Sequence, residues 1–266
     1  MDISIQRIND IPFDRTSRYY AYTIHVDHHR ILTLATTSAK TLSKWLTGIL
    51  KSTISPILIA VSAEHDLHQH TKRRGAAAAK DLPYDILTLC SGSQCLIYHL
   101  DTRMYDSDSR DYAPNKTLRD FFESPKVIAL GMDMDVVANK MERYHGIKIK
   151  NALDIRALAS EGFKLESYDV ARYNVEKLAI SALGKEFDMA RPKKRVEWYG
   201  GDELKNYFPY WSRELRLEKV QFATVDAYLC FLVGSQAYQL IHHSSIATTE
   251  EDSKAKKKKE KKNSKN

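Results

Sequence analysis

The chain contains an uninterrupted apolar run, residues 57–61, that begins directly after Pro56 and is followed by polar side chains. A strand buried on both faces reads as continuous apolar sequence, because neither of its faces meets water. This run therefore predicts the central strand of a sheet that carries helices on both sides. We expect residues 86–90 and 127–130, two further apolar segments of strand length, to flank it.

The segments around this run predict an order of further elements. Residues 19–26 and 31–35 form a predicted hairpin, and a helix with its N-cap at Ser38 follows it and ends at Leu50. The remaining predicted elements are, in chain order, a hairpin of residues 86–90 and 95–99, a helix at 118–122, strands at 127–130 and 147–153 around a helix at 136–144, and helices at 175–183 and 220–240.

Antiparallel strands followed by alternating helices and strands are typical of the α/β class. We expect a five-stranded mixed sheet flanked by helices, with an extra N-terminal β-hairpin and helix. Residues 1–55 then belong to the same domain as the main body, residues 56–243. Residues 244–266 are expected to form a disordered lysine-rich tail, since residues 251–266 contain no aromatic and no large aliphatic side chain with which to bury surface.

The formal charge of +7 is concentrated at the C-terminus. Residues 254–266 hold eight lysines and one glutamate, so the preceding residues have a formal charge of zero. Lysine-rich segments serve as nuclear localisation signals, as electrostatic tethers for nucleic acid or as solubilising ends, and all three interpretations stay open. The basic charge is therefore a property of the tail and not of the folded body.

The chain has no apolar run of membrane-spanning length, and its first residues, MDISIQRIND, do not read as a secretory signal. Its three cysteines are an odd number without zinc-ligand spacing, which favours reduced structural thiols. We therefore expect a protein of the nucleus, the cytoplasm or both that is not secreted and has no membrane partner.

Several segments resemble, in the same order, the motifs of one known family. They are LTLC (residues 87–90) with CLIYHL (95–100), TLRDFF (117–122), VIALGM (127–132), LDIRALA (153–159), LAISALGK (178–185), Trp211, and EKVQFA (218–223) with VDAY (225–228). The chain is thereby identified as similar to the Werner-exonuclease-like branch of the DnaQ-like 3′-5′ exonucleases, the DEDD group with a ribonuclease H-like fold. Its N-terminal hairpin and helix further resemble small plant members, including the RISC-interacting clearing exoribonucleases.

The resemblance implies phosphodiester hydrolysis with two Mg²⁺ or Mn²⁺ ions on single-stranded RNA or DNA, and the likeness to the plant members favours RNA. Carboxylates are the ligands that such hard cations need. The family places an Asp-x-Glu pair at the end of the central strand, an Asp after a later strand and an Asp in the last helix. A Tyr four residues before that last Asp orients the attacking water.

Carried over to this sequence, the family's carboxylates are only partly retained. The first pair falls on Ser62 and Glu64, so a serine stands where the family has its metal-bridging aspartate. The resemblance assigns the next ligand to Asp135, with Asp133 as the runner-up, and the last one to Asp226. Two of the four acids of the pattern, Asp135 and Asp226, are thus expected to accompany Glu64 in one cleft.

The group that orients water is also changed. Phe222 replaces the family's tyrosine, and Gln221 stands where another subclass has a histidine. An alternative acid pair, Glu64 and Asp66, repeats the same spacing two residues along and keeps both side chains on the same sheet face. This leaves open whether Asp66, or a group from a second copy of the chain in a homo-oligomer, completes the metal site.

Two functional hypotheses follow. In the first, which the resemblance favours, the chain is a 3′-5′ exonuclease whose degenerate site has weak activity. In the second, it is a catalytically inactive homologue that binds nucleic acid or acts as a scaffold. Structural roles compete with the catalytic ones: Asp135 and Asp226 also suit capping or surface positions, and Asp154 suits a helix cap.

The first prediction concerns the two replaced positions. Ser62→Asp combined with Phe222→Tyr restores the family's pattern and should raise metal-dependent exonuclease activity, because it returns a carboxylate and a water-orienting hydroxyl. The measurement is shortening of end-labelled single-stranded RNA. If Glu64 and Asp66 are the working pair instead, Asp66→Ala should abolish the native activity while the double variant changes little.

Overall fold

The computed structural model describes residues 2–8, 19–51, 55–65, 82–100, 113–184, 198 and 215–263. Within them an eight-stranded mixed sheet has the strand order β1-β2-β3-β6-β5-β4-β7-β8. The strands are β1 Ile3–Arg7, β2 Tyr19–Val26, β3 His29–Thr36, β4 Ile57–Glu64, β5 Ile86–Ser91, β6 Gln94–His99, β7 Val127–Gly131 and β8 Ala152–Asp154. The α/β class with a mixed sheet is confirmed, and the N-terminal strands lengthen the sheet beyond the five strands expected.

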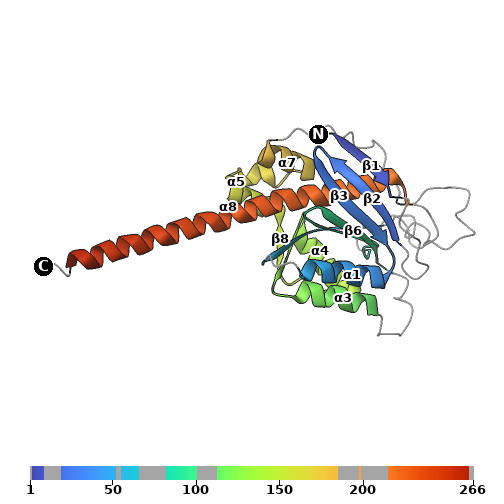
Figure 1. The fold of residues 1–266 in the computed structure, drawn as a ribbon, viewed down its shortest axis with the longest axis horizontal. Coiled ribbons are helices and arrows are strands. Elements are labelled where there is room, and N and C mark those ends of the chain that lie inside the picture. Colours follow the sequence, from blue (N-terminus) through green and yellow to red (C-terminus); the bar gives the residue numbers. More distant parts are fainter. Residues whose placement is uncertain are drawn as a thin grey trace, which may run out of the picture.

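Helices cover both faces of this sheet (Figure 1). Buried side chains of α1, α3 and α4 pack on one face, and those of α5, α6, α7 and α8 pack on the other. The helices are α1 Ala39–Leu50, α3 Ala113–Glu123, α4 Met134–His145, α5 Ile155–Phe163, α6 Ser167–Val170, α7 Val175–Leu183 and α8 Leu217–Asn263. No helix in the described part of the chain is long and apolar enough to cross a membrane.

Strand β4 lies between β5 and β7 and is covered on both faces, as its continuous apolar run predicted, although it is the sixth of the eight strands. It pairs antiparallel with β5 and parallel with β7. Ile59 and Val61 belong to the core beneath α1, α3 and α4, whereas Ala60 belongs to the core beneath α8. Because successive side chains of a strand point to opposite faces, Ser62 and Glu64 continue the α8 side.

Local signals explain where several helices begin and end. The Ser38 hydroxyl accepts a hydrogen bond from the Thr41 amide at 3.4 Å, which confirms the predicted N-cap of α1. The Asn174 side chain caps α7 in the same way, and Gly184 ends that helix with a φ of 63°. Glycine adopts this left-handed conformation without the steric cost that a Cβ brings.

Two segments differ from the sequence prediction. The strand expected at residues 147–153 is short, and only Ala152–Asp154 pairs with β7. The alternating burial of residues 147–150 looked like a strand, but the Lys150 amide donates to the Phe122 carbonyl of α3 at 3.1 Å. Hydrogen bonding to β7 therefore begins only at Asn151, whose carbonyl accepts from the Ala129 amide at 2.8 Å.

The second difference is the C-terminal segment. Helix α8 continues to Asn263, so residues 244–263 are helical where the composition predicted disorder. The segment is rich in Lys and also contains Glu, and both residues have high intrinsic helix propensity. A helix that is already packed on the body needs no new nucleus to extend. In Figure 1 the last part of α8 projects away from the sheet.

Small residues let α8 approach its neighbours closely. A Cβ on Gly234 would lie 2.9 Å from a Leu130 methyl group, and a Cβ on Gly162 of α5 would lie 2.8 Å from the Ala237 backbone. At the sheet, the buried hydroxyls of Thr33 and Thr224 are 3.1 Å apart and share a hydrogen bond. These contacts fix the position of α8, which carries the last family acid, Asp226.

Gly162→Ala tests this close packing. The added methyl group collides with the backbone of α8, so we expect the free energy of unfolding to fall by about 1–3 kcal/mol in urea denaturation. Gly48→Ala in α1 is the matched control, since a Cβ there meets nothing within 4 Å. It should raise stability by about 0.5–1 kcal/mol through helix propensity. Stabilisation by both variants would show that α5 and α8 are not in contact at this point.

Candidate functional site

The end of β4 meets the beginning of α8. Glu64, which the resemblance matches to an acid of the exonuclease motif, forms an ion pair with Lys219 through its Oε2 atom. The two residues are 155 positions apart in the sequence, and their side chains are only 30% and 17% exposed. Because both are partly removed from water, their attraction is screened less than that of a surface pair.

The Lys219 ammonium has a second neighbour, the ring of Trp198, whose centroid is 4.9 Å away. Trp198 is buried, and its carbonyl oxygen accepts a hydrogen bond of 2.9 Å from the Arg216 amide just before α8. An aromatic face attracts a cation through its quadrupole. Lys219 is thus held both by a carboxylate and by an aromatic ring.

Helical spacing places the other family positions of α8 on the same side as Lys219. Phe222 is three residues and Asp226 seven residues further along, which corresponds to one and two turns of helix. Both side chains are half-buried, as is that of Gln221. Phe222 brings no hydroxyl to this face, so the water-orienting group expected from the resemblance is missing here.

The acids that precede or begin α4 have different surroundings. Asp133 is the N-cap residue of α4, with a φ of 52° and no side-chain capping bond, and its carboxylate pairs with Arg156 at 2.6 Å. Asp135 is exposed in the first turn of α4, where the positive end of the helix dipole favours an acid. Asp133, the runner-up, is therefore engaged by an arginine, and Asp135 faces solvent.

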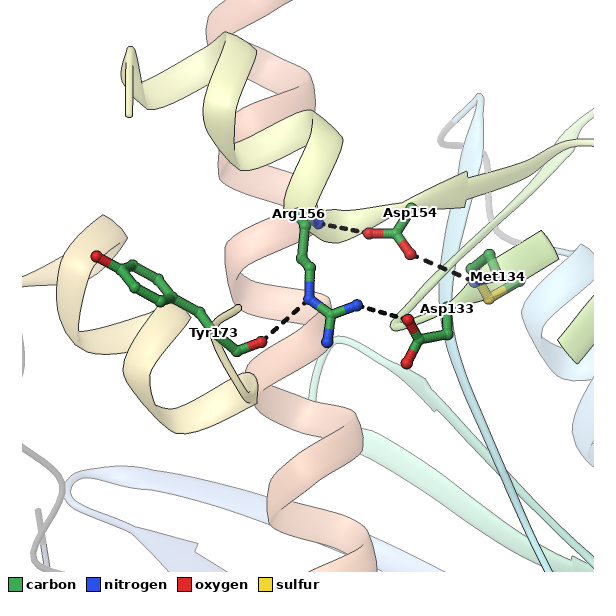
Figure 2. A network of polar contacts seen from close by, with 5 residues as sticks. All are labelled: Asp133, Met134, Asp154, Arg156 and Tyr173. Carbon is green, nitrogen blue, oxygen red and sulfur yellow. Dashed lines mark hydrogen bonds and ion pairs between the residues drawn. The ribbon is translucent and has the colours of Figure 1, made fainter. Parts of the chain in front are cut away.

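Arg156 and Asp154 join three segments at this point (Figure 2). The Asp154 carboxylate accepts from the Arg156 amide at 2.8 Å, as the N-cap of α5, and from the Met134 amide at 3.3 Å. The Arg156 side chain donates from Nε to the Tyr173 carbonyl at 3.0 Å and reaches Asp133. The predicted structural role of Asp154 is confirmed, and the network fixes the start of α4.

A second cluster of basic and aromatic side chains surrounds His65, the residue directly after β4. His65 Nδ1 lies 2.8 Å from the Pro83 carbonyl, which can only accept, so this nitrogen is the donor. The His65 ring stacks on Tyr84, and Lys140 of α4 lies 3.5 Å from His65 Nε2 and 5.1 Å from the Tyr84 ring centroid. Burial, followed by the charge of Asp133, raises the pKa of Tyr84, which keeps its phenol protonated.

The sequence did not reveal these two lysines as parts of the site. Lys219 was visible only as a member of the closing-helix motif, and its partner lies on a distant strand. Lys140 stands within an apolar helical stripe, where a lysine is out of place, and this was the one available signal. His65, which follows β4 directly, is half-buried.

The donor set at this site does not fit a two-metal centre. Within the described ranges, no three His, Cys, Asp or Glu side chains gather into a group that could hold a metal ion, so Glu64, Asp135 and Asp226 do not form one. Ser62 offers a neutral hydroxyl in place of a bridging carboxylate, and Glu64 is bound to a lysine. Asp66, the alternative acid, and Trp211 of the family motif lie outside the described residues.

Comparison with solved structures relates the fold to known proteins. The EXO domain of Aedes aegypti Nibbler matches with a TM-score of 0.51 at 16% identity, over 79% of this chain and 88% of that one. The catalytic core of RRP6 from Trypanosoma brucei gives 0.49 at 14% identity, over 84% and 50%. Escherichia coli RNase D, an exoribonuclease involved in structured RNA processing, gives 0.49 at 12% identity, over 79% and 45%.

These likenesses concern the fold. The chain spans about half the length of the trypanosome protein and less of RNase D. No family model matches the chain, and no curated protein matches it significantly. The mixed α/β fold is that of ribonuclease H-like exonuclease structures, and the match to the Nibbler EXO domain covers most of both chains.

A pH titration tests the core that supports Tyr84. Burial lowers the pKa of His145 from 6.5 to about 4, while a hydrogen bond to the Tyr84 backbone acts in the opposite direction. Between these values the unfolded chain takes up a proton that the folded chain refuses, so stability should fall as the pH drops from 6.5 towards 4. The loss should reach about 3 kcal/mol in urea denaturation.

His145→Gln removes this titration and should flatten the profile over that pH range. The matched control is His28→Gln, in the exposed turn between β2 and β3, which should leave the wild-type slope unchanged. Equal slopes in the wild type and His145→Gln would contradict the assignment to His145.

Proposed function

We propose that this chain is a non-catalytic nucleic-acid-binding protein built on the fold of 3′-5′ exonuclease domains. The observation that carries the proposal is the Lys219–Glu64 ion pair. In this pair, the positive charge of Lys219 neutralises Glu64, the one acid of the family's Asp-x-Glu pattern that β4 carries. The same strand has already lost the other acid of the pair to Ser62.

Electrostatics explains why this arrangement opposes two-metal hydrolysis. Two unit charges about 4 Å apart interact by about 4 kcal/mol at an effective dielectric constant near 20. A divalent cation beside Glu64 would meet at least that repulsion from Lys219, without the bridging carboxylate that normally offsets it. The loss of a water-orienting hydroxyl at Phe222 adds a rate loss of about 10²–10⁴.

The charge distribution supports binding of a polyanion. The body carries no net charge, whereas residues 254–266, at the far end of a helix that leaves the body, have a net charge of +7 (Figure 1). Lysines that contact phosphates bind nucleic acid without sequence preference and release counterions. With the resemblance to the small plant members, this favours single-stranded RNA as the ligand, in the nucleus or the cytoplasm.

A combined binding and degradation assay tests the proposal. Purified protein is incubated with 5′-labelled single-stranded RNA and Mg²⁺ or Mn²⁺, beside an Asp226→Ala variant. We expect intact RNA that is shifted in a native gel, with the same result for both proteins. A ladder of shortened products that Asp226→Ala abolishes would instead identify an active exonuclease. No shift even at low salt would leave a scaffold without nucleic-acid ligand.

Removal of residues 251–266 locates the binding charge. The truncated protein should bind RNA more weakly, and the salt dependence should flatten by roughly 0.7 in log–log slope for each phosphate that the protein no longer neutralises. Lys40→Gln with Lys44→Gln, on exposed positions of α1, is the control that removes charge from the body. It should keep the wild-type slope, and a weakening equal to that of the truncation would place the binding surface on the body.

A further inference from the structure

We infer that Lys219 supplies from within the chain the positive charge that a divalent cation supplies to the family's acid pair, so that this site is complete without metal. The inference deepens the proposed non-catalytic function and rests on it. The Lys219 ammonium group occupies the position from which a metal cation would contact Glu64.

The charges at the end of β4 balance in this form. The family's Asp-x-Glu pair brings two negative charges, which a divalent cation matches. Here Ser62 leaves Glu64 as the single charge of the pair, and the single charge of Lys219 matches it. The serine and the lysine are thus complementary changes: with an aspartate at position 62, one lysine would leave a negative charge over.

The position of Lys219 in the first turn of α8 also indicates that Glu64 stabilises its charge. Lys219 stands in the first turn of α8, which begins at Leu217. The dipole of a helix disfavours a cation at its N-terminal end. A lysine at this place therefore gains nothing from its own helix, and its stabilising partners are the Glu64 carboxylate and the Trp198 ring.

Trp198 is the second partner of the Lys219 ammonium. It is only 2% exposed, its ring centroid lies 4.9 Å from the Lys219 ammonium, and its carbonyl is bonded to the Arg216 amide three residues before that lysine. Trp198 is thus hydrogen-bonded to the residue that directly precedes α8. A hydrated divalent cation needs several oxygen ligands or waters around it, and an indole ring offers neither.

Thermal unfolding with and without Mn²⁺ tests the inference, and no RNA is present in the experiment. Wild type, Ser62→Asp and Ser62→Asp with Lys219→Met are compared in EDTA and in millimolar Mn²⁺. We expect Mn²⁺ to raise the Tm of Ser62→Asp with Lys219→Met alone, by roughly 5–10 °C at about 100 times its Kd. The ion pair thereby revises the first prediction: while Lys219 is present, Ser62→Asp with Phe222→Tyr should gain no metal-dependent activity. Ser62→Asp with Lys116→Met is the control, because Lys116 pairs with Asp120 on the distant helix α3.

Three outcomes would overturn the inference. Ser62→Asp responding to Mn²⁺ as strongly as the double variant would show that Lys219 does not hold the cation's position. A Mn²⁺ response of the wild type would show the same for the native site. If Ser62→Asp with Lys219→Met is folded by circular dichroism and its Tm does not respond to Mn²⁺, then Glu64 does not contact a cation at this position.

A double-mutant cycle in EDTA keeps the test decisive if the Asp-containing variants do not fold. Lys219→Met and Glu64→Gln should each lower the Tm, and the two together should lower it by less than the sum, because each single change leaves a partly buried charge without its counter-charge. Additive effects would refute the pairing. A failure to bind RNA would refute the proposed function but leave these metal and coupling results as they are.

Discussion

The packing of α8 across the sheet is the contact on which the rest of the structure depends. Small residues at the contact allow the helix to lie close to β7 and α5, and the buried Thr33–Thr224 hydrogen bond ties it to the N-terminal strands. The helix is thus fixed both at β7 and at the N-terminal strand β3. Its first turn then has to lie at the end of β4, and this brings Lys219 to Glu64.

Much of the fold was predictable because the signals are local. The continuous apolar run of β4 could only be a strand covered on both sides, and Ser38 and Gly184 mark helix ends by their own chemistry. The alternation of apolar and basic residues over 147–150 predicts a strand, yet the Lys150 amide is bonded to α3 and pairing with β7 begins only at Asn151. The Lys-rich composition of residues 244–263 cannot build a core and therefore predicts disorder. The same residues favour helix once the preceding part of α8 is packed on the sheet, because no new helix nucleus is needed.

The electrostatics of the candidate site could not be predicted from the sequence. The resemblance points to Ser62, Glu64 and Asp226, and alternation along β4 places the first two on the side of α8. The partner of each acid depends on contacts between distant segments, such as Lys219 with Glu64 and Arg156 with Asp133. From the sequence alone, Ser62 suggests only the loss of a metal ligand. Beside the Lys219–Glu64 ion pair, the neutral serine leaves one negative charge for one positive charge.

The parallel pairing of β3 with β6 has a consequence for how copies of this chain can meet. A strand at the rim of a sheet exposes unpaired amide and carbonyl groups and so invites another chain to add to it. The N-terminal strands close that rim at β6 and leave β1 and the three-residue β8 as the outer strands of the described sheet. Of these two, β1 is the longer, so among the described strands it offers a second molecule more unpaired backbone groups to pair with, and its exposed side chains, Ser4 and Gln6, are polar.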